Sequence, residues 1–274
     1  MPPAQFSPIQ TLMAHHDCPG YAIQLESNRG KFTMLRGDTH QPAAIVRTGK
    51  LHIESELSNL LTVVGQLGDG ACMLDVGANI GLVAVPCASL LASKGGSVIA
   101  FEAQRIVFYM LAANCVANNL LNLHCYHLAV SDSNTVLQIP PMTYTEVRDF
   151  GMVQFGSTAE LDQSDGSDRT LVGKETVKAI EIDSLELTRV DLMKIDVEGM
   201  EMRVLEGAKR TIATHRPILW IEYWLDRDNI CTALHQLGYD LWFVDNLNLL
   251  CVAREKLEDF RCVVNAPKYQ PVAT

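Results

Sequence analysis

The chain has 274 residues, of which 48% are hydrophobic and 20% are charged, and its formal net charge is −10 at pH 7. This length allows one elaborated domain or at most two, and the composition lacks the low hydrophobicity of a disordered chain. The net negative charge argues against a polymeric DNA or RNA substrate, because no overall positive field would attract phosphates.

The eight cysteines are scattered through the chain without a Cys-x-x-Cys pair, a pattern typical of a reducing compartment. Residues 1–18 lack the basic flank and apolar run of a signal peptide, and no segment approaches the ~18 apolar residues that a membrane span needs. We therefore expect a cytoplasmic protein without a membrane span. A homo-oligomer is compatible with the three tryptophans of the C-terminal third.

Residues 1–70 are interpreted as an N-terminal extension packed on the core, because no linker separates them from the rest of the chain. Residues 21–27 and 31–36 alternate like the strands of a hairpin around a turn at 28–30, and residues 54–66 have a helical pattern.

From residue 71 to residue 265, short apolar runs alternate with amphipathic segments, which is typical of a parallel sheet with helices on both faces. The expected strands are 72–76, 97–102, 123–130, 177–182, 191–197 and 218–223, and the expected helices are 80–92, 105–118, 201 onward and 228–237. Two further strands, 240–245 and 249–254, face each other across a turn and predict an antiparallel closing pair. The fold class expected from these segments is α/β, with a mostly parallel sheet.

Residues 131–174 break the alternation with polar and turn-forming clusters. Long excursions inside compact domains are usually functional. We therefore interpret this segment as a lid, with aromatic and polar groups of residues 139–144 and 149–151 covering a ligand ring. The tail, 266–274, is expected to be frayed.

The most informative stretch is Met73 to Gly81, which reads MLDVGANIG directly after an apolar strand. Glycine at this point permits a tight turn and close approach of a ligand to the backbone. The order Gly77-x-Asn79-x-Gly81 departs from the dinucleotide pattern G-x-G-x-x-G. Asp75 would also place negative charge beside a pyrophosphate, whereas a cofactor that carries an ammonium and a sulfonium tolerates that charge.

Glu102 ends the next expected strand, 21 positions beyond Gly81. An acid at this place commonly binds the ribose of a nucleotide cofactor, so Glu102 alone does not distinguish the two cofactor classes. Ligands of open α/β sheets lie at the carboxyl ends of the strands, and the combination of these residues at consecutive strand ends therefore predicts a cofactor site.

Two more blocks accompany this loop: FEAQR at residues 101–105, and KIDVEGME at 194–201 continuing as RVLEGA at 203–208. With DVGANIG, they resemble the FkbM family of S-adenosylmethionine-dependent methyltransferases over most of residues 72–222. The resemblance implies a Rossmann-like class I methyltransferase fold, with a seven-stranded sheet whose last strand is antiparallel. It implies S-adenosyl-L-methionine as cofactor, S-adenosylhomocysteine as product, and O-methylation of a hydroxyl on a sugar, glycan or secondary metabolite. Ala103 and Gln104 depart from the proline and polar residue of many members.

The resemblance also implies roles for individual residues. The methionine portion of the cofactor is expected at the loop formed by Asp75, Gly77, Ala78, Asn79 and Gly81. The ribose is expected at Glu102 and Ala103, and the adenine at Ala129, Val130 and Ser131. Asp196 is expected to contact the cofactor as well.

Methyl transfer to an alcohol needs a group that takes the hydroxyl proton, and the candidate catalytic carboxylates are Asp196, Glu198 and Glu222. Close carboxylates raise one another's proton affinity, which suits a general base, although they could equally bind a divalent cation. We favour the base and assign no metal, because no further ligand set is evident. Glu198 is equally compatible with capping the following helix. Lys194 either neutralises an acid or simply points outward.

Two alternatives stay open: a nicotinamide-dependent oxidoreductase, and a non-catalytic protein that binds S-adenosylmethionine. The acceptor is expected to be a small molecule or glycan with a hydroxyl, without further identification.

Overall fold

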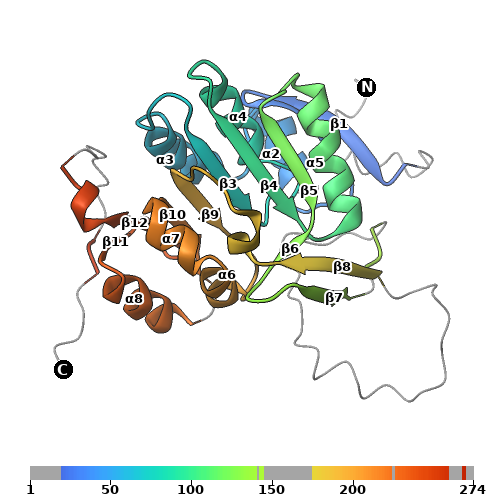
Figure 1. The fold of residues 1–274 in the computed structure, drawn as a ribbon. Helices are drawn as coiled ribbons and strands as arrows, with labels where there is room; N and C mark the ends of the chain where they lie inside the picture. The colour runs from blue at the N-terminus through green and yellow to red at the C-terminus, as the bar shows by residue number, and fades with distance from the viewer. Residues whose placement is uncertain (1–19, 141, 145–174, 224–225, 259–266, 270–274) are drawn as a thin grey trace, which may run out of the picture.

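The computed structural model describes residues 20–140, 142–144, 175–223, 226–258 and 267–269. A central sheet carries helices on both faces (Figure 1). Its order is β11-β12-β10-β9-β3-β4-β5, and β12 runs antiparallel to both of its neighbours while the other pairs are parallel. The bounds are β3 Cys72–Val76, β4 Ser97–Glu102, β5 Leu123–His127, β9 Leu192–Ile195, β10 Ile218–Glu222, β11 Tyr239–Phe243 and β12 Asn248–Ala253. The predicted fold class and antiparallel closing pair are confirmed.

Alternate residues of each central strand face different helices, since successive side chains point to opposite sides of a sheet. Met73 and Trp220 pack with the N-terminal segment, α2 Gln41–Thr48, α3 Glu54–Val64, α4 Ala84–Ala92 and α5 Arg105–Ala117. Leu74 and Ile221 pack on the opposite face with α6 Glu201–Gly207, α7 Lys209–His215 and α8 Arg227–Gln236. In the described part of the chain, no helix is both long and apolar enough to cross a membrane.

This alternation also sets where the polar residues of the strands point. Asp75 lies two residues after Met73, Lys194 two after Leu192, and Glu222 two after Trp220, and residues two apart on a strand point to the same face. All three therefore face the side of the sheet that the N-terminal segment and α3 to α5 cover.

The N-terminal hairpin, β1 Ala22–Ser27 and β2 Gly30–Leu35, is fastened to α5 by two asparagine side chains. Asn114 Oδ1 accepts a hydrogen bond from the Thr33 amide (2.6 Å), and Asn114 Nδ2 donates to the carbonyl oxygens of Thr33 (3.0 Å) and Ile80 (2.8 Å). Asn118 Oδ1 accepts a hydrogen bond from the Lys31 amide (2.9 Å), and Asn118 Nδ2 donates one to the Lys31 carbonyl oxygen (2.8 Å). The hairpin is thus tied to both α5 and the loop that precedes α4.

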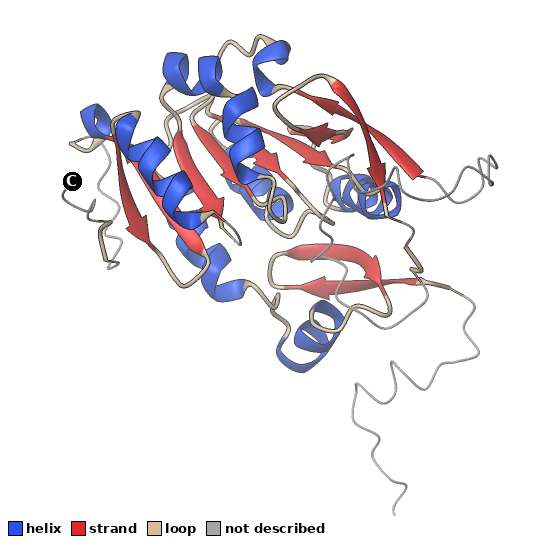
Figure 2. Cartoon of the chain, turned by 90° about the horizontal axis from the view of Figure 1, so that it is seen from below, coloured by secondary structure: helices blue, strands red, loops and turns tan. Residues whose placement is uncertain are grey.

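Two of the predicted strands lie partly or wholly outside the main sheet. The expected strand 123–130 ends at His127, and its last residues form β6 Ala129–Val130, which pairs with β8 Glu175–Ile180. The expected strand 177–182 is this β8, which pairs also with β7 Thr135–Ile139 in a separate three-stranded sheet beside the main one (Figure 2). An apolar run does not reveal a turn inside it, and here the chain leaves the main sheet at Leu128.

Only the first part of the predicted lid belongs to the described residues, namely 131–140, which contain β7, and 142–144. Residues 141 and 145–174 lie outside them, and β8 begins directly after the predicted lid. The tail expected to be frayed contributes residues 267–269, which pair with β11 through Trp242 and Lys268. The rest of the tail lies outside the described residues.

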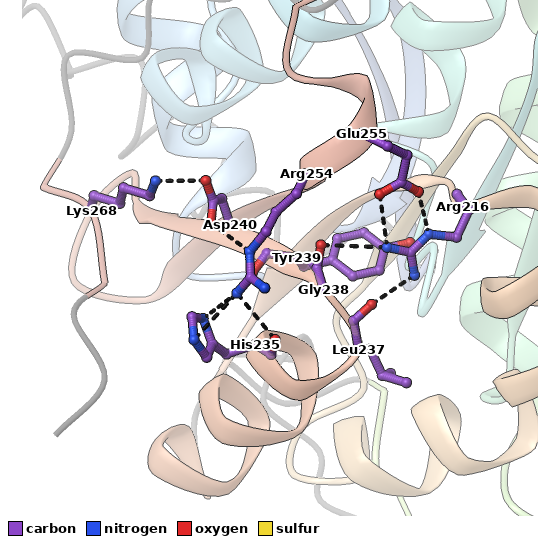
Figure 3. A network of polar contacts seen from close by, with 9 residues as sticks. All are labelled: Arg216, His235, Leu237, Gly238, Tyr239, Asp240, Arg254, Glu255 and Lys268. Atoms are coloured by element: carbon purple, nitrogen blue, oxygen red, sulfur yellow. Dashed lines mark hydrogen bonds and ion pairs between the residues drawn. The ribbon is translucent and has the colours of Figure 1, made fainter. Parts of the chain in front are cut away.

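The β11 edge of the sheet is held by charged side chains (Figure 3). Arg216 pairs with Glu255 at 2.6 Å and lies over the ring of Tyr239, 4.5 Å from its centroid. Asp240 pairs with Arg254 (3.1 Å) and Lys268 (2.6 Å). These contacts join β11, the segment after β12 and the loop that precedes β10.

Candidate cofactor and acceptor site

The loop after β3 is held tightly against the ends of two neighbouring strands. The amides of Gly77 and Ala78 donate to the Phe101 carbonyl oxygen at 3.1 and 2.9 Å. Gly77 has a φ of +79°, and a Cβ there would overlap the Asp196 carbonyl oxygen. Only glycine fits this approach. The loop continues until α4 begins at Ala84, four residues later than the sequence pattern predicts.

Glu102 closes this loop from the end of β4. Its side chain is buried, Oε2 accepts a hydrogen bond from the Asn79 amide (2.9 Å), and Oε1 accepts one from the Gln104 amide (2.7 Å). Burial outweighs these two hydrogen bonds and raises the pKa of Glu102 to about 7. The carboxylate itself closes the turn at Ala103 and Gln104.

Lys194 places a cation in the site. The sequence pattern left open whether its side chain neutralises an acid or points outward. It is 4% exposed, and its Nζ lies 2.8 Å from Asp196 Oδ2 and 3.6 Å from Asp75 Oδ1. Burial opposes its charge, but the carboxylates of Asp196 and Asp75 raise its pKa above the ordinary value. A lysine on a central strand with apolar neighbours is itself a signal, because buried lysine requires a partner.

A small cavity of about 60 Å³ lies at the carboxyl ends of β3, β4 and β9, backed by the three-stranded sheet. Seven predicted cofactor residues line it: Gly77, Asn79, Glu102, Ala103, Ala129, Val130 and Asp196. Sequence reasoning missed others in its wall, including Phe101, Gln104, Leu128, Val197 and Met200.

A larger cavity of about 370 Å³ adjoins it, and four residues line both: Gly77, Asn79, Asp196 and Glu198. Ala78, Lys194 and Glu222 line the larger cavity only. Part of its wall comes from the N-terminal segment, through residues between Met34 and Glu56. Sequence reasoning assigned no site residue to that segment, because its hairpin and helix carry no motif that points to a ligand.

The three predicted catalytic carboxylates therefore meet at one cavity, but their surroundings differ. Asp196 is paired with Lys194, whereas Glu222 lies near carboxylates. Burial and the charge of Asp196 raise the pKa of Glu222 to about 8. Burial likewise raises the pKa of Glu56, a residue of α3 in the same cavity wall.

Glu198 has a φ of +52° and is followed by Gly199 at +99°, an uncommon conformation for a glutamate. Backbone conformations of this kind cluster at functional sites. The amide of Gly199 donates to Glu201 Oε1 at 2.9 Å, so Glu201 holds the start of α6. The N-cap residue of α6 is Met200, which makes no side-chain capping hydrogen bond.

Three predicted cofactor residues line neither cavity: Asp75, Gly81 and Ser131. Asp75 is fully buried beneath the loop beside Lys194, and burial raises its pKa. Ser131 is also buried, and its carbonyl oxygen would overlap a Cβ at Gly207. The glycine of the RVLEGA block thus allows α6 to approach the chain after β6, where Arg203 also pairs with Asp132 at 2.9 Å.

A family model described as "Methyltransferase FkbM domain" matches residues 75–241, more than half of the 274 residues. The chain belongs to the FkbM methyltransferase family. None of the curated proteins matches the chain.

Solved structures similar to this FkbM protein include the FkbM methyltransferase of Methylobacillus flagellatus KT. It has 17% sequence identity and a TM-score of 0.46, over 76% of this chain and 52% of that chain, so the match spans about half the length of that protein. Another is the Pyrococcus abyssi tRNA (uracil-54, C5)-methyltransferase in complex with S-adenosyl-L-homocysteine, with 13% identity, a TM-score of 0.42, and 85% and 44% coverage.

Proposed function

We propose that this protein is an S-adenosyl-L-methionine-dependent O-methyltransferase that acts on a hydroxyl of a sugar, glycan or secondary metabolite. The observation that carries the proposal is the junction of two cavities at the Gly77 loop, one closed by Glu102 and the other lined by Glu222. Membership of the FkbM family supports methyl transfer as the reaction.

The residues present fit the cofactor. Glu102 retains acceptor capacity for ribose hydroxyls beside its two backbone hydrogen bonds. The wall formed by Leu128, Ala129 and Val130 offers an apolar surface to the adenine. The carboxylates of Asp196 and Glu198, which border both cavities, suit the positive charges of the methionine portion.

When bound, S-adenosylmethionine supplies a methyl group on a sulfonium, so that the acceptor oxygen forms a C–O bond while the S–C bond breaks and its electrons stay on sulfur. The hydroxyl proton must leave in the same event. We assign it to Glu222, because a carboxylate with a pKa of about 8 accepts a proton near neutral pH more readily than an ordinary glutamate. Asp196, anchored by Lys194, orients the groups between the two cavities.

Calorimetric titration with S-adenosylhomocysteine tests the cofactor assignment. We expect micromolar binding that Glu102→Ala weakens at least tenfold, since the variant loses the ribose partner and leaves two backbone amides unsatisfied. Glu206→Ala, which removes an exposed carboxylate on α6, is the matched control and should bind as the unchanged protein does. Absence of binding by folded protein would contradict the proposal.

A further inference from the structure

The N-terminal segment forms a fixed wall of the larger cavity. Asp38 Oδ1 accepts hydrogen bonds from the amides of His40 and Gln41, each at 2.8 Å. Gln41 Oε1 accepts one from the His52 amide at 3.0 Å, and the rings of His40 and His52 stack with centroids 4.9 Å apart. These contacts tie the chain before α2 to the chain before α3, the helix that carries Glu56.

When they are ionised, Glu56 and Glu222 supply negative charge on the part of this cavity that lies outside the smaller one. Both line the larger cavity and not the smaller, whereas Asp196 and Glu198 border both and are accounted for by the cofactor. Among the described residues, no cation lies within ion-pairing distance of Glu56 or Glu222, and Lys194 is paired with Asp196 and Asp75.

Glu222 is ionised in the form that acts as the base, and an ionised carboxylate accepts hydrogen bonds and donates none. The ligand that complements Glu56 and Glu222 is therefore rich in hydrogen-bond donors, such as hydroxyl or ammonium groups. A phosphate or carboxylate on the ligand would meet like charge in a partly buried site. The apolar side chains of Leu35, Val83 and Leu247 in the same lining offer a surface for the C–H face of a ring.

We propose that this cavity selects the methyl acceptor by charge: it takes a polyhydroxylated ring that is uncharged or carries an amine, and rejects one that carries phosphate or carboxylate. Glu56, supplied by the N-terminal segment, is the specificity-determining residue. The inference rests on the proposed function, because it gives the substrate class of the same site.

Cysteine labelling tests the charge of the cavity without knowledge of the acceptor. Leu247→Cys places a thiol in the cavity lining, at a position that is 37% exposed, and Leu121→Cys places one at a 96% exposed position outside that lining. Each variant is treated at pH 8.5 with a cationic and an anionic methanethiosulfonate reagent of similar size. The unsubstituted chain gives the background from its native cysteines.

We expect the ratio of cationic to anionic labelling rates at Leu247→Cys to exceed that at Leu121→Cys by about tenfold. One carboxylate ~10 Å from the reacting thiol changes such a ratio about fourfold in water-like surroundings. Adding Glu56→Gln to Leu247→Cys should therefore lower the ratio about fourfold, whereas adding Glu206→Gln should leave it unchanged.

Equal ratios at the two thiols, an anionic preference in the cavity, or no effect of Glu56→Gln would each overturn the proposal. A Leu247→Cys thiol that reacts with neither reagent would also overturn it, since the cavity would then admit no ligand of this size. These outcomes are independent of S-adenosylhomocysteine binding, so failure of the selectivity proposal is distinguishable from failure of the methyltransferase proposal.

Discussion

Two charged clusters lie at opposite ends of β10 and follow opposite physical rules. Arg216 precedes this strand and belongs to the C-terminal network of Figure 3, whereas Glu222 ends it at the larger cavity. In the network, the hydrogen bond from Arg216 lowers the pKa of the exposed Glu255 to about 2. At the cavity, burial raises the pKa of Glu222 to about 8.

The comparison distinguishes carboxylates that stabilise the fold from carboxylates that are available for chemistry. Surface carboxylates paired with guanidinium groups are already satisfied and stay ionised. Carboxylates that burial holds near their neutral form can exchange a proton at physiological pH, which is what a general base requires.

The largest expected effect is on methyl transfer. Glu222→Gln should lower kcat by two to four orders of magnitude, because glutamine cannot take the hydroxyl proton. In the unchanged protein, the rate should rise with pH to a plateau above about 8, since only the deprotonated carboxylate acts as a base, and the variant should lack this rise. The measurement is transfer of a labelled methyl group to an identified hydroxylated acceptor.

Asp240→Asn, which removes a carboxylate from the C-terminal network, is the control and should leave the rate unchanged. An unaltered rate in Glu222→Gln would assign the proton to another group, with Asp196 and Glu198 as the next to test. If all three substitutions left transfer unchanged, the carboxylates of this cavity would have no catalytic role.

A second effect concerns the buried cation. Lys194→Met should lower the free energy of unfolding by about 3–5 kcal/mol in urea titration, because it leaves Asp75 and Asp196 without their partner. The matched change in the exposed network, Lys268→Met, should cost about 1 kcal/mol or less. Combining Asp75→Asn with Lys194→Met should recover part of the loss, and strict additivity of the two changes would contradict a direct interaction.

A third effect is the pH dependence of stability, and its sign differs between the clusters. The folded pKa of Glu222 is about 8 against a usual 4.5, so the folded state holds a proton that the unfolded chain releases. Its contribution to stability therefore declines as pH rises from about 4.5 to 8. For Glu255 the folded pKa is about 2, so its contribution is present above about 4.5 and is lost as pH falls toward 2.

Urea titrations at pH 5, 7 and 9 measure both effects. Glu222→Gln should flatten the decline above pH 5, whereas Glu255→Gln should cost about 0.5 kcal/mol at pH 7 and leave that decline unchanged. If stability still declines with rising pH in Glu222→Gln, other groups cause most of the decline, such as Glu102 with its pKa of about 7.

Much of the site could be predicted because its residues follow strands directly. Gly77, Glu102 and Asp196 come at or just beyond the ends of three parallel strands. The carboxyl ends of parallel strands meet at one edge of the sheet, however the helices pack against it. Positions that depend on a turn inside an apolar run were less predictable. The departure of the chain at Leu128, which moved β6 into another sheet, leaves no mark in the residue pattern.

The sequence by itself determined the fold class, the family and the edge of the sheet at which the cofactor residues gather, since strand period and local glycine chemistry act over a few neighbouring residues. Only the tertiary structure decided that Asp75 lies buried beneath the loop while Glu56 lines the cavity. Burial and proximity depend on which distant segment covers a strand. Asn114 and Asn118 hold the N-terminal hairpin against α5 through contacts more than 80 residues apart in the chain.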